Sequence, residues 1–185
     1  MACPQARVLL PFLQRADEIS KVNPKVAYFC RLHAIEEGMR LSDRTEETNK
    51  LLGSILKQLE VDKPKVKAEL PEVDRKYCED FAAKIFENAD REDRAGKASK
   101  KTALAYYAAT IFMEITTQFG PMAAELAARQ KYAAWKSADI NKALKEGRVP
   151  APGPPASAND YIDDGELDRE LAALELSMDP AGGWG

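Results

Sequence analysis

The single histidine of the chain, His33, and the nearby Cys30 come closest to a catalytic pair. Three positions apart on a helix, the two side chains would be neighbours, so that a thiol nucleophile could meet an imidazole base. No acid that would orient the imidazole accompanies them, and no strand-to-helix turn that would form an oxyanion hole does so either. We therefore interpret His33 as a packed structural histidine and predict no catalytic residue.

Three clustered acids, Asp90, Glu92 and Asp93, are of the residue type that binds calcium. A calcium loop alternates its oxygen ligands, contains a glycine and ends in a bidentate glutamate, whereas Arg91 and Arg94 interrupt this cluster. The three cysteines and the one histidine are too scattered to form a zinc site. We expect no metal and no cofactor.

A glycine and three lysines follow these acids in the sequence. No predicted strand precedes Gly96-Lys97, and the glycine spacing differs from that of a phosphate-binding loop. The neighbouring acids largely cancel the positive charge of the lysines. The whole stretch 90–101 is therefore predicted to be a polar joint between two helices, with Asp90 or Asp93 as the helix cap.

Composition and charge narrow the class of protein. The 185 residues carry a net charge of −3 at pH 7, which argues against a nucleic-acid binder because that function needs clustered positive charge. Three distant cysteines without a CxxC motif favour a reducing compartment. No apolar run approaches the roughly 20 residues of a membrane span, and the N-terminus lacks the features of a signal peptide. We expect a cytoplasmic protein that neither binds nucleic acid nor inserts into a membrane.

Apolar residues recur at helical spacing up to about residue 147, and no useful stretch alternates with period two. The sequence therefore predicts an all-α fold. Three helices precede a break marked by Pro64 and Pro71, and three follow it. We expect two tandem three-helix modules packed together, at residues 1–63 and 73–149, with a linker at 64–72.

The C-terminal residues 150–185 begin with a proline-rich segment, which predicts a flexible, disordered tail. Within the tail, apolar residues recur at helical spacing among acids: Leu167, Leu171, Leu174 and Met178. Two interpretations stay open. The segment is either a short amphipathic docking helix, able to occupy a groove of its own chain, or a nascent helix in a disordered tail.

The third predicted helix carries more apolar surface than a three-helix bundle needs. One stripe about 100° wide is enough for such a bundle, but this helix has one edge with Leu51 and Ile55 and a second with Leu52, Leu56 and Leu59. The second edge predicts a groove for an incoming amphipathic helix or, equally, a surface that the other module covers.

Three motifs, in the same order and spacing, together resemble one family: NPKVAYFCRLHA at 23–34, ADREDRAG at 89–96 and RQKYAAWK at 129–136. The family is that of the vacuolar-sorting regulators that stimulate the Vps-four AAA ATPase, also called LYST-interacting protein five. The resemblance covers roughly residues 5–150. It implies two MIT (microtubule-interacting and transport) modules that bind the tails of ESCRT-III subunits, in a non-enzymatic adaptor of multivesicular-body sorting that is recruited from the cytoplasm to endosomes.

The resemblance also implies where the first module binds its partner. The family's groove receives a short amphipathic helix between the second and third helices, and by position it falls on Leu52, Leu56 and Leu59. Lys57 occupies a position at which some members have an acid, so one charged contact to a basic tail is expected to differ here.

The second module is implied to hold a different ESCRT-III subunit by a longer wrap. In the last predicted helix, Tyr132 and Trp135 lie one turn apart with lysines alongside, which suits an acidic helical partner. The candidate contact residues of this module are Tyr106, Tyr107, Trp135 and Asp139.

Members of this family end in a small helical domain that dimerises and contacts the ATPase. This chain stops at Gly185 without such a domain, so we expect contact with the ATPase only through a region absent here. The alternative hypothesis is a structural helical scaffold whose extra apolar edges only join its two modules.

Overall fold

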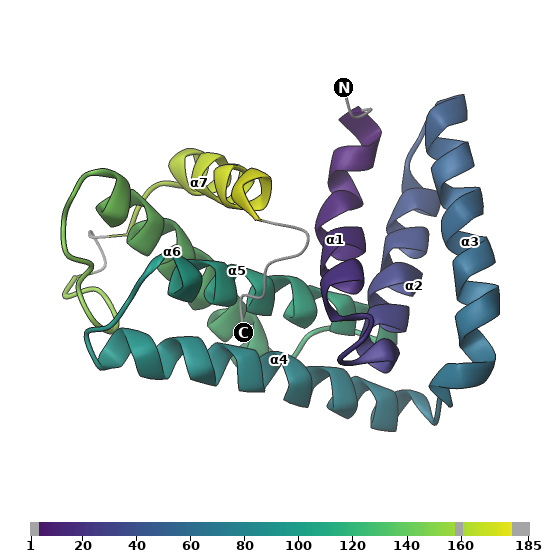
Figure 1. Cartoon of the computed structure of the whole chain (residues 1–185), viewed down its shortest axis with the longest axis horizontal. Helices are drawn as coiled ribbons and strands as arrows, with labels where there is room; N and C mark the ends of the chain where they lie inside the picture. The colour runs from purple at the N-terminus through teal and green to yellow at the C-terminus, as the bar shows by residue number, and fades with distance from the viewer. Residues whose placement is uncertain (1–3, 158–160, 179–185) are drawn as a thin grey trace. The chain divides into compact units, whose positions relative to one another are not determined.

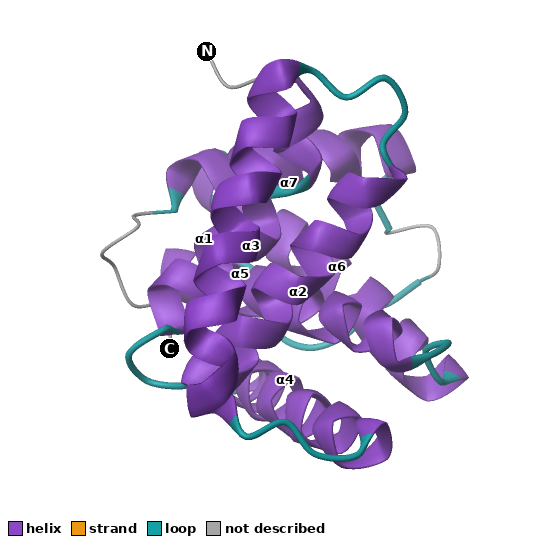
Figure 2. Cartoon of the chain, turned by 90° about the vertical axis from the view of Figure 1, so that its right-hand side faces the viewer, coloured by secondary structure: helices purple, strands orange, loops and turns teal. Residues whose placement is uncertain are grey.

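The computed structural model describes residues 4–157 and 161–178 of the chain. Every regular element within these ranges is a helix (Figure 1 and Figure 2), so the predicted all-α fold is confirmed. In chain order the elements are the 3-10 helix η1 (Pro4–Val8), α1 (Leu10–Ile19), α2 (Pro24–Arg40), α3 (Glu46–Val66), α4 (Pro71–Arg94), α5 (Lys100–Glu114), the 3-10 helix η2 (Ile115–Phe119), α6 (Ala124–Lys145) and α7 (Asp164–Ser177).

The chain divides into two compact units. The first comprises residues 1–78 and 115–121, and the second comprises residues 79–114 and 122–185. Helices α1 to α3 therefore belong to the first unit and α5 to α7 to the second, while α4 contributes residues to both. A compact unit is not necessarily a separately folding domain, so the module boundaries expected from the sequence stay a prediction.

Side-chain caps define where α2 and α3 begin. The Asn23 side chain accepts a hydrogen bond from the backbone N–H of Val26 at 3.1 Å, and Pro24 occupies the first turn, a common pattern at helix starts. The Thr45 hydroxyl accepts one from the backbone N–H of Thr48 at 3.1 Å, so Thr45 is the cap of α3.

Helix α3 continues past the predicted break. It runs to Val66 even though Pro64 lies in its last turn. Proline there removes the hydrogen bond to the carbonyl of Glu60, but Glu60 is exposed, so water can replace the lost partner. Val66 is buried and keeps the last turn in place, and the helix ends at Lys67 in the left-handed conformation (φ 52°).

The core of the first unit forms around α2, which packs against both α1 and α3. Gly38 allows the close approach of α3, because a Cβ at this position would lie 2.4 Å from Cδ2 of Leu52. Helix α2 buries residues on the sides of both neighbours, although Leu32 is half-buried and Met39 is exposed. The main core side chains are Phe12, Ile19, Val26, Phe29, Leu52, Ile55 and Leu59.

The second unit has α5 packed against α6, with α7 packed against both. Aromatic rings link α4 to α5: the Phe81 and Phe112 ring centroids are 4.9 Å apart, and those of Phe86 and Tyr106 are 5.7 Å apart, all edge-on. Small residues along α5 and α6 allow close packing of these helices, namely Ala103, Ala105, Ala108, Ala109, Ala133, Ala138 and Ala143, all buried.

The acidic segment of the tail forms α7, with the Asp163 side chain accepting a hydrogen bond from the Glu166 backbone N–H at 2.9 Å. This helix belongs to the second unit, where it lies beside α6 (Figure 1). Of the two interpretations of this segment, the structure supports a short helix docked on its own chain, and the surface on which α7 packs is that of α5 and α6. The other parts of the predicted flexible tail at 158–160 and 179–185 lie outside the described residues.

Candidate partner-binding surfaces

The three leucines predicted to line the first groove have different environments on α3. Leu52 and Leu59 are 4% and 6% exposed and belong to the core of the unit, whereas Leu56 is 46% exposed. The difference follows from their register, because the side of α3 that faces α2 is taken by Leu52, Ile55 and Leu59. Of the three leucines predicted to line the groove, only Leu56 therefore exposes a large apolar surface to solvent.

The surface beside Leu56 is open. Gly53 precedes it by one turn on the same side of α3, and a Cβ at Gly53 would meet no described atom within 4 Å. An exposed leucine next to bare helix backbone can accept an apolar side chain from a second helix. Lys57 is also exposed, so a basic group borders this place.

Helix α2 contributes a partly exposed stripe of its own. Leu32 and Glu36 are half-buried and Met39 is exposed, and their spacing of four and three residues places them on one side of the helix. Burial raises the pKa of the Glu36 carboxyl, and the nearby charge of Arg40 opposes this effect. A methionine and a leucine flanking one acid are suited to an amphipathic helix with a basic group.

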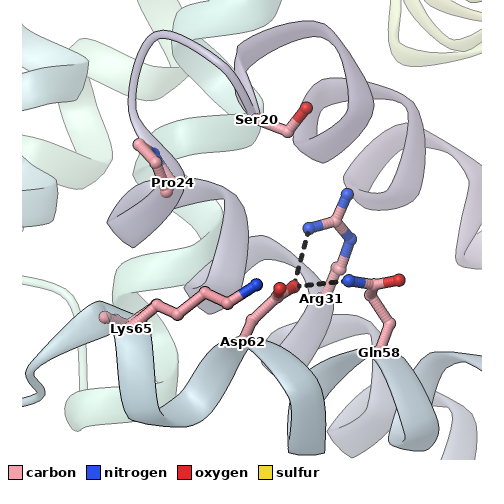
Figure 3. A pocket seen from close by; sticks show the side chains of 7 residues that line it. Ser20, Pro24, Arg31, Gln58, Asp62 and Lys65 are labelled. Carbon is pink, nitrogen blue, oxygen red and sulfur yellow. Dashed lines mark hydrogen bonds and ion pairs between the residues drawn. The ribbon is translucent and has the colours of Figure 1, made fainter.

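A small polar hollow of about 210 Å³ lies where the end of α1 and the end of α3 face α2 (Figure 3). Its lining side chains already pair with one another: Arg31 contacts Asp62 at 3.5 Å, and Gln58 donates to the same carboxylate at 2.9 Å. Arg31 also contacts Asp17 at 3.1 Å. A hollow of this size with internally paired charges offers no room for a helix, so we assign it a structural role.

The four residues predicted for the second module lie in the second unit, mostly away from solvent. Tyr106, Tyr107 and Trp135 are buried. The Tyr106 hydroxyl donates to Oδ1 of Asp90 at 3.0 Å, and burial together with the nearby carboxylates raises its pKa. Asp139 is half-buried, and burial raises the pKa of its carboxyl.

The stretch 90–101 contains a buried anchor that sequence analysis missed. Asp93 and Lys136 are both fully buried, and their side chains form an ion pair at 2.9 Å. Lys136 donates to the carbonyl oxygens of Ala151 and Gly153, each at 2.9 Å, while the Gly153 N–H donates to Asp93 at 3.0 Å. This network fastens the start of the proline-rich tail to α4 and α6.

The expectation that Asp90 or Asp93 caps the next helix is wrong for both residues, because both lie inside α4, which ends at Arg94. The residue before α5 is Ser99, whose backbone N–H donates to the Thr102 hydroxyl at 3.0 Å. A sign of burial was present in the sequence, since Asp93 follows Ala82, Phe86 and Ala89 at helical spacing on the apolar side of α4. The arginines on either side, Arg91 and Arg94, made the segment look like an exposed charged surface instead.

The candidate chemical pair Cys30 and His33 is part of the core. His33 is 2% exposed, and its ring lies edge-on to Phe12 with centroids 4.5 Å apart. Burial, with a smaller contribution from Cys78, raises the pKa of the Cys30 thiol, so the nucleophilic thiolate is disfavoured. The structural interpretation of His33 agrees with this geometry.

Helix α7 covers part of the α5 and α6 surface. The Tyr107 hydroxyl donates to Glu175 at 2.6 Å, and Glu170 accepts hydrogen bonds from Asn141 and Lys145, each at 3.0 Å. Just before α7, the Tyr161 ring lies 4.8 Å from that of Trp135. Two of the predicted contact residues, Tyr107 and Trp135, thus already contact a segment of their own chain.

Across the described ranges, no helix is long and apolar enough to span a bilayer. In the same ranges no group of three histidine, cysteine or acidic side chains is placed to hold a metal ion. The fold of the described residues is that of a helical-bundle protein.

The chain belongs to the Vta1-like family, whose model matches residues 8–146. It is 52% identical over 152 residues to an Arabidopsis thaliana protein named homolog of mammalian LYST-interacting protein 5, a match that covers 81% of this chain and 36% of that protein. It is 35% identical over 186 residues to the vacuolar protein sorting-associated protein VTA1 homolog of Dictyostelium discoideum, covering 96% and 34%. The Bos taurus protein of the same name is 34% identical over 183 residues, covering 96% and 59%.

The resemblance to this family inferred from three motifs is thereby confirmed. The family is one of vacuolar protein sorting and not of enzymes. The chain spans between about a third and three fifths of the length of these relatives.

Proposed function

We propose that this chain is a non-enzymatic adaptor of the ESCRT and multivesicular-body pathway that binds the helical tails of ESCRT-III subunits. Membership of the Vta1-like family supports the pathway, and the relatives are named as vacuolar protein sorting-associated proteins. In this proposal the protein acts from the cytoplasm and is recruited to endosomes through its partners.

The observation that carries the proposal is the exposed Leu56 beside the open backbone of Gly53. An amphipathic helix lying along α3 and α2 would bury the exposed half of Leu56 against its own leucines. Apolar burial stabilises by about 25 cal/mol per Å² of surface removed from water. Binding energy in such interfaces concentrates in a few central side chains, and Leu56 has the central position here.

Regulation of the Vps-four AAA ATPase forms the second part of the proposal. Binding of ESCRT-III tails by this region would bring the regulator to the filaments that the ATPase disassembles. We assign the direct contact with the ATPase to a region outside this chain, because the chain spans only part of the length of its relatives.

Calorimetric titration of the chain with synthetic ESCRT-III tail peptides tests the proposal. Saturable binding with a negative heat-capacity change is expected, because an apolar helix face is buried. The alternative, a structural scaffold, has one observation in its favour: Leu52 and Leu59 are packed in the core of the unit. If none of the peptides gives saturable heat, the adaptor proposal fails and the scaffold is favoured.

A further inference from the structure

Helix α7 contacts the second unit through one side only. Leu174 is fully buried and Met178 is 6% exposed, while Leu167 and Leu171 are half-buried. Leu176, two positions from Leu174, is 88% exposed. The helix therefore lies on the surface of α5 and α6 as an amphipathic segment. Its apolar side packs on these helices, and its opposite side is exposed to solvent.

The charges of α7 complement the surface beneath it. Residues 164–177 contain five acidic side chains and one basic one, a net charge of −4. Three of the acids contact polar or basic groups of α5 and α6: Glu166 with Lys142, Glu170 with Asn141 and Lys145, and Glu175 with Tyr107. The covered surface thus has an apolar centre with basic and hydrogen-bonding groups around it.

The polar contacts between α7 and α6 are weak enough to break reversibly. Lys145 is 52% exposed and Lys142 is 31% exposed, and ion pairs in contact with solvent contribute little to stability. A helix of 14 residues is marginal alone, so α7 forms because it is docked. The buried Asp93–Lys136 network fixes the tail as far as Gly153, and the ten residues 154–163 separate it from the start of α7 at Asp164.

We propose that α7 is a built-in competitor at the α5–α6 surface beneath it. This inference rests on the proposed binding of ESCRT-III helices, for which this surface would be the docking site of an acidic amphipathic helix in the second module. In the resting chain α7 occupies the site. A partner helix that presents a leucine in place of Leu174 and acids toward Lys142 and Lys145 exchanges with it. This site lies in the second unit, so it is independent of the proposed binding at Leu56 in the first.

The covalent connection between α6 and α7 sets how strongly α7 competes. A segment that belongs to the same chain as its site, close to it in sequence, has an effective concentration of about a millimolar. A partner helix with the same contacts must overcome that concentration, so its apparent affinity is low until α7 is released. Release of α7 exposes the α5–α6 surface and leaves the side chains of α5 and α6 unchanged.

The test uses the full chain and a fluorescein-labelled peptide of residues 161–178 as the probe, with anisotropy as the readout. Leu174→Asp in the chain places a charge at the buried centre of the contact and should release α7. Leu176→Asp is the matched control, because it adds the same charge to the same helix at an exposed position. We expect the Leu174→Asp chain to bind the peptide at least about tenfold more tightly than the wild-type and Leu176→Asp chains do.

A charge exchange tests the polar part of the site. In the Leu174→Asp background, Lys145→Glu should weaken peptide binding severalfold, and Glu170→Lys in the peptide should restore it. Lys145 is largely exposed, so the change leaves the fold intact. Equal peptide binding to all chains, or no binding to the Leu174→Asp chain, overturns the proposal.

A second variant keeps the proposal testable if Leu174→Asp prevents folding. If Leu174→Asp fails to fold, the pair Glu170→Lys and Glu175→Lys releases α7 through half-buried positions instead. Trp135 fluorescence, recorded after Trp184→Phe, reports release directly because Trp135 contacts Tyr161 next to α7. Unchanged Trp135 emission in the released chains contradicts the proposal, whereas a red shift supports it. The titration with ESCRT-III tail peptides tests the site at Leu56 separately, so its outcome does not depend on either result.

Discussion

At the scale of single residues, two glycines of the first unit have opposite surroundings. A Cβ at Gly38 would lie 2.4 Å from the Leu52 side chain, whereas a Cβ at Gly53 would meet no described atom within 4 Å. Both lie inside helices, where glycine costs about 1 kcal/mol relative to alanine. The first glycine is required by packing, and the second leaves an open surface beside Leu56.

Gly38→Ala and Gly53→Ala are therefore expected to change stability in opposite directions. Gly53→Ala should raise the free energy of unfolding by about 0.5–1 kcal/mol, because helix propensity improves at no steric cost. Gly38→Ala should lower it by roughly 1 kcal/mol, since the displaced Leu52 costs more than the propensity gains. Urea unfolding followed by circular dichroism measures both. Equal shifts in the two variants would contradict the packing described for α2 and α3.

The buried ion pair between Asp93 and Lys136 has a different role from the surface charges around it. Both side chains are inaccessible to solvent, and each also has hydrogen-bond partners in the same network. Removing one partner leaves an uncompensated charge in the interior, which is far more costly than losing a surface pair. The pair therefore makes the second unit sensitive to single substitutions at either position.

Asp93→Asn should destabilise the second unit by about 3–5 kcal/mol, because the charge of Lys136 then lies buried without a counterion. The double variant with Lys136→Met removes both charges and should recover part of this loss. Arg94→Gln is the control, since Arg94 pairs with Asp90 at the surface and is expected to change stability by less than about 1 kcal/mol. Thermal unfolding of the four proteins gives the comparison. A double variant no better than Asp93→Asn would refute a direct pairing.

At the scale of elements, the charge of Glu170 makes one contribution to the docking of α7. Burial tends to raise the pKa of this carboxyl, but hydrogen bonds from Lys145 and Asn141 and the charge of Lys145 outweigh it, so the pKa lies below the ordinary value of 4.5. A carboxyl with a lowered pKa stabilises the docked state above its ordinary pKa. This contribution is lost as pH falls through the lowered value.

Docking of α7 should accordingly weaken as pH falls below about 4.5, with full strength at neutral pH. Glu170→Gln should remove the part of the pH dependence that belongs to this carboxyl and weaken docking at pH 7. Hydrogen exchange of the α7 amides between pH 7 and pH 4, corrected for intrinsic rates, follows the change. An identical pH profile in wild type and Glu170→Gln would show that another group controls docking.

At the scale of the whole molecule, the sequence predicts the helices because apolar residues recur with the period of a helix over long stretches. The Asn23-Pro24 helix start is visible as a local pattern, and so is a joint within 90–101, which the structure narrows to residues 95–99 between α4 and α5. The anchor Asp93–Lys136 is not, because its two residues are 43 positions apart and a charged residue is normally exposed. The exposure of Leu56 depends on which side of α3 packs on α2, which the apolar pattern alone leaves open.

The two units place the surfaces of interest in different parts of the chain. The first unit carries the exposed Leu56, and the second carries the α5–α6 surface with α7 upon it. Membership of the Vta1-like family gives both surfaces a common context in vacuolar protein sorting. We infer that the surface at Leu56 is accessible to partners, whereas the α5–α6 surface becomes accessible only when α7 leaves it.

The most direct test of the central claim is calorimetric titration of ESCRT-III tail peptides with Leu56→Asp and its control Val61→Asp. Both residues are exposed apolar side chains of α3, at 46% and 56%, and they lie about 140° apart around the helix. Leu56→Asp should weaken binding by at least about tenfold, because binding would bury an unpaired charge, while Val61→Asp should bind as the wild type does. Unchanged affinity of the Leu56→Asp chain, with its helical content intact, would contradict the account.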